Sequence, residues 1–245
     1  MPRLAFLVSL VYLVGGAVSL PEAEARSRTI SAKQKKKKRA KKKKQRARLN
    51  MPKGWQWPPS REMRAEGDAC LDRLTALGVK WKRAPSTRKV ATPIYLPKME
   101  LGGIELESIW RKGPFVMDCV LALAFAERGG PALYNVGVRK LRFSSIHDYR
   151  EIGGKKGILS RHAIGLAMDV YELVDQDGVK HVVKDHYHTE GEFLVAAEET
   201  ARATGVFRTV LTPGNDPNHH HDHFHFEART DREQYWGPEV DSSGR

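Results

Sequence analysis

Apolar residues recur every three or four positions in three stretches of the chain, a spacing typical of helices with one buried face. The second stretch is the most apolar, and the Gly129-Gly130-Pro131 sequence after it predicts the end of a helix. Gly205 follows the third stretch in the same way. The predicted helices cover residues 62–77, 115–127 and 190–204.

Other stretches alternate apolar and polar residues, which predicts strands with one buried face. Residues 166–170 place apolar side chains on one face and Asp169 on the other. Residues 223–227 set two phenylalanines against two histidines and an acid. Further strands are predicted at residues 136–146 and, around a turn at 102–103, at residues 90–96 and 103–110. Helices and strands in irregular order predict an α+β domain.

The first 25 residues have the pattern of a secretory signal. Arg3 precedes an apolar run from Leu4 to Val18, and a small-residue site, Ala23-Glu24-Ala25, follows. The run is short for a membrane span. We therefore predict a signal peptide over residues 1–25 and an exported protein, periplasmic or associated with the cell envelope, with no stable membrane span after cleavage. An uncleaved anchor is the alternative, because a cationic block directly after the run resists translocation.

That cationic block dominates the charge of the chain. Residues 26–48 contain fourteen Lys or Arg residues and no acid, so the formal net charge of +13 becomes −1 without them. Runs of like charge repel themselves, which predicts a basic disordered linker over residues 26–50 and a folded domain over residues 51–245. No aromatic residue lies among the lysines to stack on bases, so we expect anionic envelope polymers, not nucleic acid, as partners. A plain solvated linker is the alternative.

Cys70 and Cys119 are the only two cysteines, and both fall in predicted helices. An even count in an exported chain predicts a disulfide. A cross-link over 49 residues contributes about 4 kcal/mol in the chain-entropy account. Two buried thiols are the alternative.

Metal-binding side chains gather in two places. Residues 219–225 hold five of the ten histidines, and His162 precedes Asp169 by seven residues. If the two strands are neighbours, His162, Asp169 and one later histidine meet at one cation, as in catalytic zinc sites. The alternation of side chains along the second strand does not decide whether His221, His223 or His225 is the third ligand. Each group also has a simpler interpretation when it is taken alone. His162 fits a hydrogen-bonded loop histidine, Asp169 fits a structural acid beside a turn, and the histidine run fits a tract that binds metal loosely.

Two motifs around these clusters carry a family resemblance. They are Ser160-x-His162-x-x-Gly165-x-Ala167-x-Asp169 and His220-x-Asp222-His223-Phe224-His225. Together they resemble the bacterial extensin-like C-terminal domain family over roughly Cys70 to Glu227. That family is similar to D-alanyl-D-alanine metallopeptidases and penicillin-insensitive murein endopeptidases of the hedgehog and lysostaphin-type fold. The implied architecture is an antiparallel sheet with helices packed on one side.

The resemblance also implies a metal site and an activity. By position, the zinc ligands are His162, Asp169 and His225. Two neutral imidazoles and one carboxylate leave a Zn²⁺ site with a net charge of +1, which suits activation of water. The implied protein is an exported zinc metallopeptidase that hydrolyses peptide bonds of peptidoglycan, as a murein endopeptidase or carboxypeptidase.

Three further residues match catalytic positions of the related enzymes. His223 and His220 fall where histidines assist the water or the transition state, and a neutral imidazole can take a proton near neutral pH. Arg150 matches an arginine that faces the substrate, where it can hold a carboxylate or support an oxyanion. Asp222 is placed to orient a neighbouring histidine.

Two alternatives to the peptidase remain. One is a non-catalytic, zinc-stabilised module that binds the cell wall or envelope. The other is a nucleic-acid-binding protein driven by the lysines, which requires the N-terminal signal to be false. The chain also departs from the family, whose members often carry four cysteines. Arg88 and His147 stand where the second pair is expected.

Overall fold

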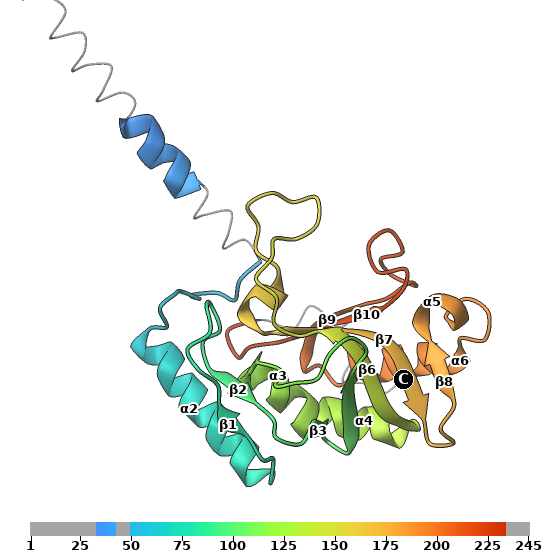
Figure 1. Cartoon of the computed structure of the whole chain (residues 1–245). Helices are drawn as coiled ribbons and strands as arrows, with labels where there is room; N and C mark the ends of the chain where they lie inside the picture. The colour runs from blue at the N-terminus through green and yellow to red at the C-terminus, as the bar shows by residue number, and fades with distance from the viewer. Residues whose placement is uncertain (1–32, 43–49, 234–245) are drawn as a thin grey trace, which may run out of the picture. The chain divides into compact units, whose positions relative to one another are not determined.

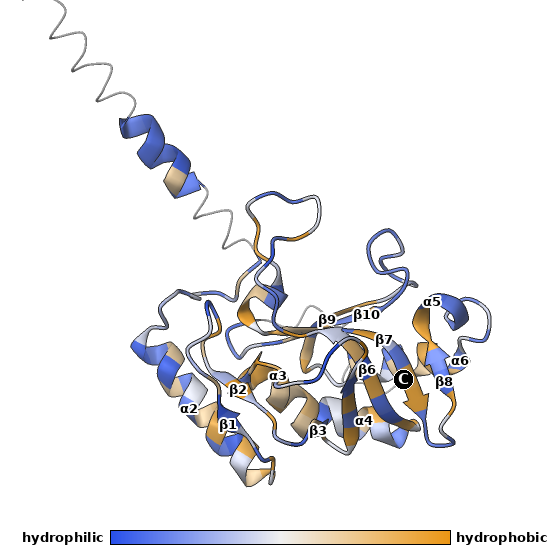
Figure 2. Cartoon of the chain, in the orientation of Figure 1, coloured by the Kyte–Doolittle hydropathy of each residue, from blue (hydrophilic) through white to orange (hydrophobic). Residues whose placement is uncertain are grey.

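The computed structural model describes residues 33–42 and 50–233, which belong to two separate units, residues 1–44 and 45–245. In the first unit, residues 33–42 form an α-helix with every residue exposed, and it is almost wholly hydrophilic (Figure 2). The disordered linker that we expected over residues 26–50 is therefore helical in this part. Lys, Arg, Gln and Ala have high helix propensity. The predicted signal peptide lies outside the described residues.

In the part of the chain that the structure describes, no helix combines the length and apolar character needed to cross a membrane.

The second unit is built on a seven-stranded sheet, which confirms the α+β class. Along the sheet the order is β3 (Glu100–Leu101), β4 (Ile104–Ser108), β6 (Val138–Ser145), β7 (Ala167–Asp175), β10 (Phe224–Ala228) and β9 (Phe207–Leu211), with β8 (Lys180–Val182) paired to β7. A smaller sheet contains β1 (Lys82–Arg83), β2 (Pro93–Tyr95) and β5 (Met117–Asp118).

The large sheet is mixed, so the expectation of an antiparallel sheet is wrong at one pair. β4 and β6 run parallel, whereas the other pairs are antiparallel. A helical crossover connects β4 to β6 and returns the chain to the same end of the sheet, as parallel strands require. The turn at residues 102–103 joins β3 to β4, and the strand predicted at 90–96 pairs elsewhere, as β2.

The helical segments of the second unit are α2 (Arg61–Ala76), α3 (Cys119–Ala124), the π-helical η1 (Phe125–Gly129), α4 (Gly130–Asn135), the 3₁₀ helix η2 (Arg161–Ile164), α5 (Val183–His186) and α6 (Glu192–Ala203). Figure 1 shows α3 and α4 on one side of the sheet, whereas the loops at residues 146–160 and 212–223 project from the other. The helices predicted at 62–77 and 190–204 are confirmed as α2 and α6.

The helix predicted at residues 115–127 differs at both ends. It begins only at Cys119, after the carboxylate of Asp118 caps it by accepting the Val120 N–H at 3.1 Å. Gly129-Gly130-Pro131 does not end it, because the chain continues through η1 into α4. A Cβ at Gly130 would lie 2.5 Å from the Leu101 carbonyl oxygen. The glycine therefore allows close packing against the β3–β4 turn, a role that a helix stop signal does not reveal.

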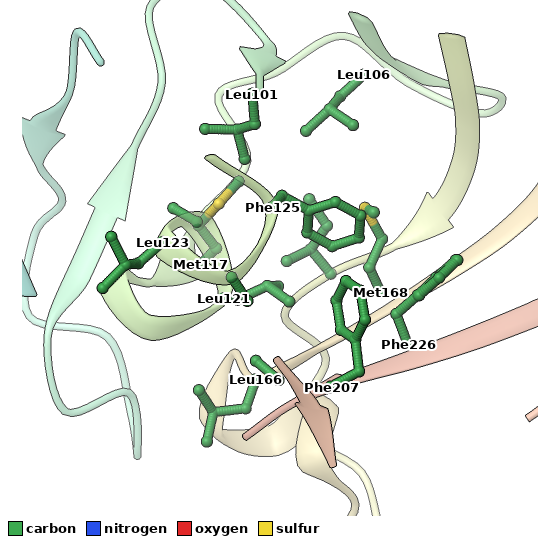
Figure 3. Packing of buried hydrophobic residues seen from close by; sticks show 14 of the residues in the cluster. Leu101, Leu106, Met117, Leu121, Leu123, Phe125, Leu166, Met168, Phe207 and Phe226 are labelled. Carbon is green, nitrogen blue, oxygen red and sulfur yellow. The ribbon is translucent and has the colours of Figure 1, made fainter. Parts of the chain in front are cut away.

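Three phenylalanines pack beneath β9 and β10 (Figure 3). The ring centroids of Phe125, Phe207 and Phe226 are 5.0 to 5.5 Å apart, in edge-on or tilted contacts. Phe226 lies in β10, where successive side chains point to opposite faces. Its neighbours His225 and Glu227 therefore point to the opposite face of the sheet, where both are also buried.

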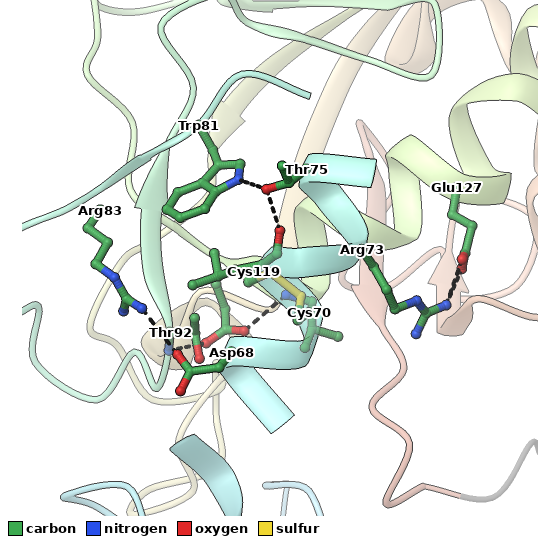
Figure 4. The surroundings of a disulfide bond; sticks show 12 residues. Asp68, Cys70, Arg73, Thr75, Trp81, Arg83, Thr92, Cys119 and Glu127 are labelled. Carbon is green, nitrogen blue, oxygen red and sulfur yellow. Dashed lines mark hydrogen bonds and ion pairs between the residues drawn. A yellow bond between two sulfur atoms is a disulfide. The ribbon is translucent and has the colours of Figure 1, made fainter. Parts of the chain in front are cut away.

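A disulfide joins Cys70 of α2 to Cys119 of α3, as predicted for this cysteine pair (Figure 4). Two further contacts tie α2 to its surroundings there. Arg73 donates hydrogen bonds to Glu127 of η1 at 2.6 and 2.7 Å, and Trp81 donates to Thr75 at 3.1 Å. The cross-link therefore fastens α2 to the central helix of the domain.

Replacing both cysteines with serine is expected to lower the free energy of unfolding by about 4 kcal/mol. The physical reason is that the cross-link restrains 49 residues of the unfolded chain. Denaturation in urea measures the difference. A reductant should reproduce the loss in the wild-type protein and leave the double variant unchanged. Equal stability of the two oxidised proteins would contradict the assigned role.

Candidate metal centre

Three buried side chains bring polar atoms together on the face of the sheet opposite α3 and α4. The Nε2 atom of His162 lies 3.0 Å from Asp169 Oδ1 and 3.2 Å from His225 Nδ1, and the last two atoms are 2.6 Å apart. Across the described residues, this is the one group of three or more His, Cys, Asp or Glu side chains close enough to hold a metal ion. The three residues that the family resemblance implied as ligands thus meet.

Strand pairing brings two of the three together. β7 and β10 are antiparallel, with His225 directly opposite Asp169 and Phe226 opposite Met168. Both apolar residues are buried in the core. The alternation of strand side chains then places the imidazole and the carboxylate side by side on the other face.

The 3₁₀ helix η2 supplies the third. Ser160 caps it, with Oγ accepting the backbone N–H of His162 at 3.3 Å. Gly165 ends it with φ of +71°, and a Cβ at this position would lie 2.8 Å from the backbone nitrogen of Asp118. Only glycine suits both the left-handed conformation and the close approach. The serine and glycine of the first motif therefore position His162.

Hydrogen bonds on the outer side of each ring fix which nitrogen carries a proton. The Nδ1 atom of His162 lies 2.8 Å from the carbonyl oxygen of Ile146, and Nε2 of His225 lies 3.2 Å from Glu227 Oε1. Both partners accept, so both outer nitrogens donate. With neutral rings, the inner nitrogens are unprotonated and face the Asp169 carboxylate. Three electron-pair donors this close repel one another unless a proton or a metal cation lies between them.

The pKa values of the cluster express the same requirement. Burial opposes ionisation of Asp169, but His162 and His225 outweigh it and hold its pKa well below the usual range. Burial likewise opposes ionisation of Glu227, yet His225 and nearby arginines lower its pKa to about 2. Burial disfavours a charged His225, but hydrogen bonds to Asp169 and Glu227 raise its pKa to about 9. The two ionised carboxylates thus stabilise one positive charge in the cluster, which a protonated His225 supplies.

The donor set fits a zinc ion. Two imidazole nitrogens and one carboxylate oxygen are the protein ligands of many catalytic zinc sites, which leave the remaining position to water or substrate. Each imidazole also has the second hydrogen bond that orients a metal-binding histidine. His162, Asp169 and His225 would hold the ion. The same donors also bind other divalent metals, iron among them.

The structure distinguishes the three histidines that alternation left open. His225 belongs to the cluster, and His221 is exposed. His223 lies beside the cluster, with Nε2 3.6 Å from Asp169 Oδ1. Its Nδ1 is 2.6 Å from Asp222 Oδ1, so this carboxylate orients it as predicted. The ring stacks on Tyr171 at a centroid distance of 5.0 Å.

His220 stands on the same side of the cluster, although it belongs to a loop. Its ring centroid lies 4.9 Å from that of His223 and 5.2 Å from that of His225. Its Nδ1 is 2.8 Å from Asp216 Oδ2. Burial lowers the pKa of His220 below the usual value in spite of this carboxylate. The ring is therefore neutral near pH 7, with Nδ1 donating and Nε2 free to accept a proton.

Arg150 reaches the cluster from the loop at residues 146–160. One guanidinium nitrogen donates to Asp169 Oδ2 at 2.9 Å, and the Ser145 hydroxyl donates to the same oxygen at 3.1 Å. Asp169 thus turns one oxygen toward the imidazoles and the other toward these donors. The Arg150 side chain is 45% exposed, so part of the guanidinium remains accessible from solvent.

Sequence reasoning missed several supporting residues. Asp216 and Ser145 contact site residues from positions that no periodic pattern marks, and Tyr171 was not recognised as a stacking partner. Glu227 was recognised only as a polar-face residue of its strand. Its position two residues after His225 carried the signal, because such neighbours share one face of a strand.

The chain matches a known family of protein domains. The family model for the extensin-like protein C-terminus matches residues 68–236, which make up more than half of the chain and contain the whole candidate centre. No curated protein and no solved structure matches the chain.

The protein is expected to bind about one zinc ion per chain, as three protein ligands allow. His162→Ala and Asp169→Ala should each lose most of this metal, because each removes a ligand atom of the cluster. His221→Ala is the control, since that histidine is exposed and outside the cluster. Elemental analysis of the purified proteins identifies and counts the metal. Full stoichiometry in both ligand variants would contradict the assignment.

Zinc affinity is expected to fall in acid. The raised pKa of about 9 means that the metal-free His225 is doubly protonated at neutral pH, and a metal ion must displace the proton on its inner nitrogen, Nδ1. The affinity should therefore rise about tenfold per pH unit up to about pH 9, with about one proton released near pH 7. Competition with a chelating indicator at several pH values measures the slope. An affinity that stays constant between about pH 6 and 8 would contradict the proton competition.

Proposed function

The chain belongs to the extensin-like C-terminal family, and from this premise we propose that it is a zinc-dependent peptidase acting on the peptide bonds of peptidoglycan. One observation carries the proposal. Beside the three candidate ligands stand two histidines and an arginine outside the ligand set, and each histidine has its own carboxylate partner. A purely structural metal site needs no such groups.

The two histidines are suited to proton transfer. Asp216 holds Nδ1–H of His220 and Asp222 holds that of His223, so each ring directs Nε2 away from its carboxylate. Nε2 of either ring can accept a proton from water and return it to the leaving amine. Zinc bound at the cluster supplies Lewis acidity for activating water and polarising a carbonyl.

Arg150 is suited to substrate binding. Its guanidinium is held at Asp169 and remains partly exposed. A guanidinium in this place can pair with a carboxylate of the substrate or stabilise negative charge that develops on a carbonyl oxygen. Stem peptides of peptidoglycan offer both groups.

The choice of substrate rests on the motif resemblance and on the N-terminal segment. The two motifs resemble those of the extensin-like family, which is itself similar to D-alanyl-D-alanine metallopeptidases and penicillin-insensitive murein endopeptidases, and this favours a hedgehog or DD-peptidase-like fold. The signal pattern would deliver the protein to the periplasm or cell envelope, where peptidoglycan is found. The cations of residues 33–42 are exposed and therefore accessible to anionic envelope polymers.

Digestion of purified murein tests the proposal. The wild-type protein should release muropeptides detectable by mass spectrometry, and a chelator should stop the reaction. His220→Ala and His223→Ala should keep zinc and lose about 100-fold or more of the rate, the size of a general acid–base contribution. His225→Ala should lose both zinc and activity.

His219→Ala is the matched control. His219 also contacts Asp216, at 3.1 Å, but its side chain is 66% exposed. Its removal should leave cleavage unchanged. A wild-type zinc protein that binds murein without cleaving it would refute the peptidase and support the non-catalytic wall-binding module. Loss of zinc in His223→Ala but not in His225→Ala would contradict the ligand assignment.

A further inference from the structure

The first motif contains a charged residue that the proposed mechanism does not use. Arg161 directly precedes His162, and its side chain is only 1% exposed. Both terminal nitrogens of its guanidinium bond the carboxylate of Glu233, one of them at 3.2 Å. A buried cation without such a partner is strongly unfavourable, so this pair is fixed.

Glu233 is itself held by a second cation and by its own segment. Arg208 Nε lies 3.6 Å from Glu233 Oε1. The backbone N–H and the hydroxyl of Thr230 each donate to Glu233 Oε2 at 3.1 Å. The carboxylate therefore lies between two guanidinium groups and has little freedom to rotate.

Arg208 links this carboxylate to the metal centre. Its NH1 group bonds Oε2 of Glu227, and the other oxygen of Glu227 accepts from His225 Nε2 at 3.2 Å. Charges thus alternate along a continuous path from Arg161 through Glu233, Arg208 and Glu227 to His225. The path begins at Arg161, which directly precedes the candidate ligand His162 in sequence, and it ends at the candidate ligand His225.

Removal of the Glu233 charge would disturb the centre in two ways. Arg161 and Arg208 both interact electrostatically with Glu227, and without the Glu233 charge they would compete more strongly with His225 for that carboxylate. A weaker hydrogen bond from His225 to Glu227 makes the imidazole a poorer metal ligand. The local charge would also become more positive by one, which disfavours a divalent cation.

We propose that Glu233 is a positioning residue of the metal centre, which balances Arg161 and Arg208 so that Glu227 remains committed to His225. The strength of metal binding then depends on the segment at residues 229–233, which contains no candidate ligand and lies outside the two motifs. The inference rests on the proposed function only in requiring that the cluster binds a divalent metal.

Glu233→Gln keeps the size of the side chain and removes its charge. We expect its dissociation constant for zinc to rise about 10- to 100-fold, the usual effect of losing an outer partner of a metal ligand. Glu66→Gln is the matched control. Glu66 pairs with Arg232 of the same segment at 2.8 Å but at an exposed position without contact to the charge path. The control should retain wild-type affinity.

A second variant separates charge from structure. Arg161→Gln with Glu233→Gln removes both charges of the buried pair and restores the charge balance. Its zinc affinity should return to within about threefold of the wild-type value, because residues in one charge network are not additive. If Glu233→Gln alone fails to fold, a double variant that folds but binds zinc weakly overturns the charge-balance account. Chelator competition on the full-length proteins gives all the affinities.

The outcomes separate the two proposals. A wild-type protein that binds no divalent metal refutes the metal centre itself. Zinc binding with equal affinity in the wild type and Glu233→Gln overturns the role of Glu233 alone. Equal weakening by Glu66→Gln would show that the segment acts only as a structural anchor. A double variant as weak as Glu233→Gln would likewise overturn the charge-balance account.

Discussion

The candidate centre depends on one strand pairing, that of β7 with β10 in the register that sets His225 opposite Asp169. A slip by one residue would turn the imidazole into the core and a phenylalanine toward solvent. Contacts of Phe226 with Phe125 and Phe207 oppose that slip, since exposing one large apolar side chain costs about 1.5–3 kcal/mol. The apolar face of the sheet therefore determines the geometry of the polar face.

Burial of so many polar groups above this core is tolerated because their outer atoms have partners. Asp169 accepts from Ser145 and Arg150 on one oxygen, and Glu227 is shared between Arg208 and His225. These contacts offset the desolvation of the charges. The negative charge of Asp169 and Glu227 is balanced by the proton that the raised pKa of about 9 keeps on His225. A divalent cation can take the place of that proton at the same inner atoms.

The sequence predicted what depends on local periodicity and on the two motifs. β7 and β10 were located because one buried face imposes a period of two, and the motifs singled out the three clustered residues. The parallel pairing of β4 with β6 was missed, because it follows from a crossover and not from either strand. Gly130 suggested a helix end because its close contact with Leu101 is tertiary. Glu233 acts from an irregular segment with no periodic signal.

Different elements of the fold supply the candidate ligands and the candidate catalytic histidines. Candidate ligands come from two paired strands and a capped 3₁₀ helix, whereas His220 comes from the loop at residues 212–223. Glu198 of α6 holds the start of that loop, accepting from Thr212 at 2.7 Å and Asn215 at 2.8 Å. A chain could keep the strands, and with them the metal, while losing the loop histidines. The difference between a peptidase and a zinc-stabilised binding module therefore lies in the loops, which the fold alone does not determine.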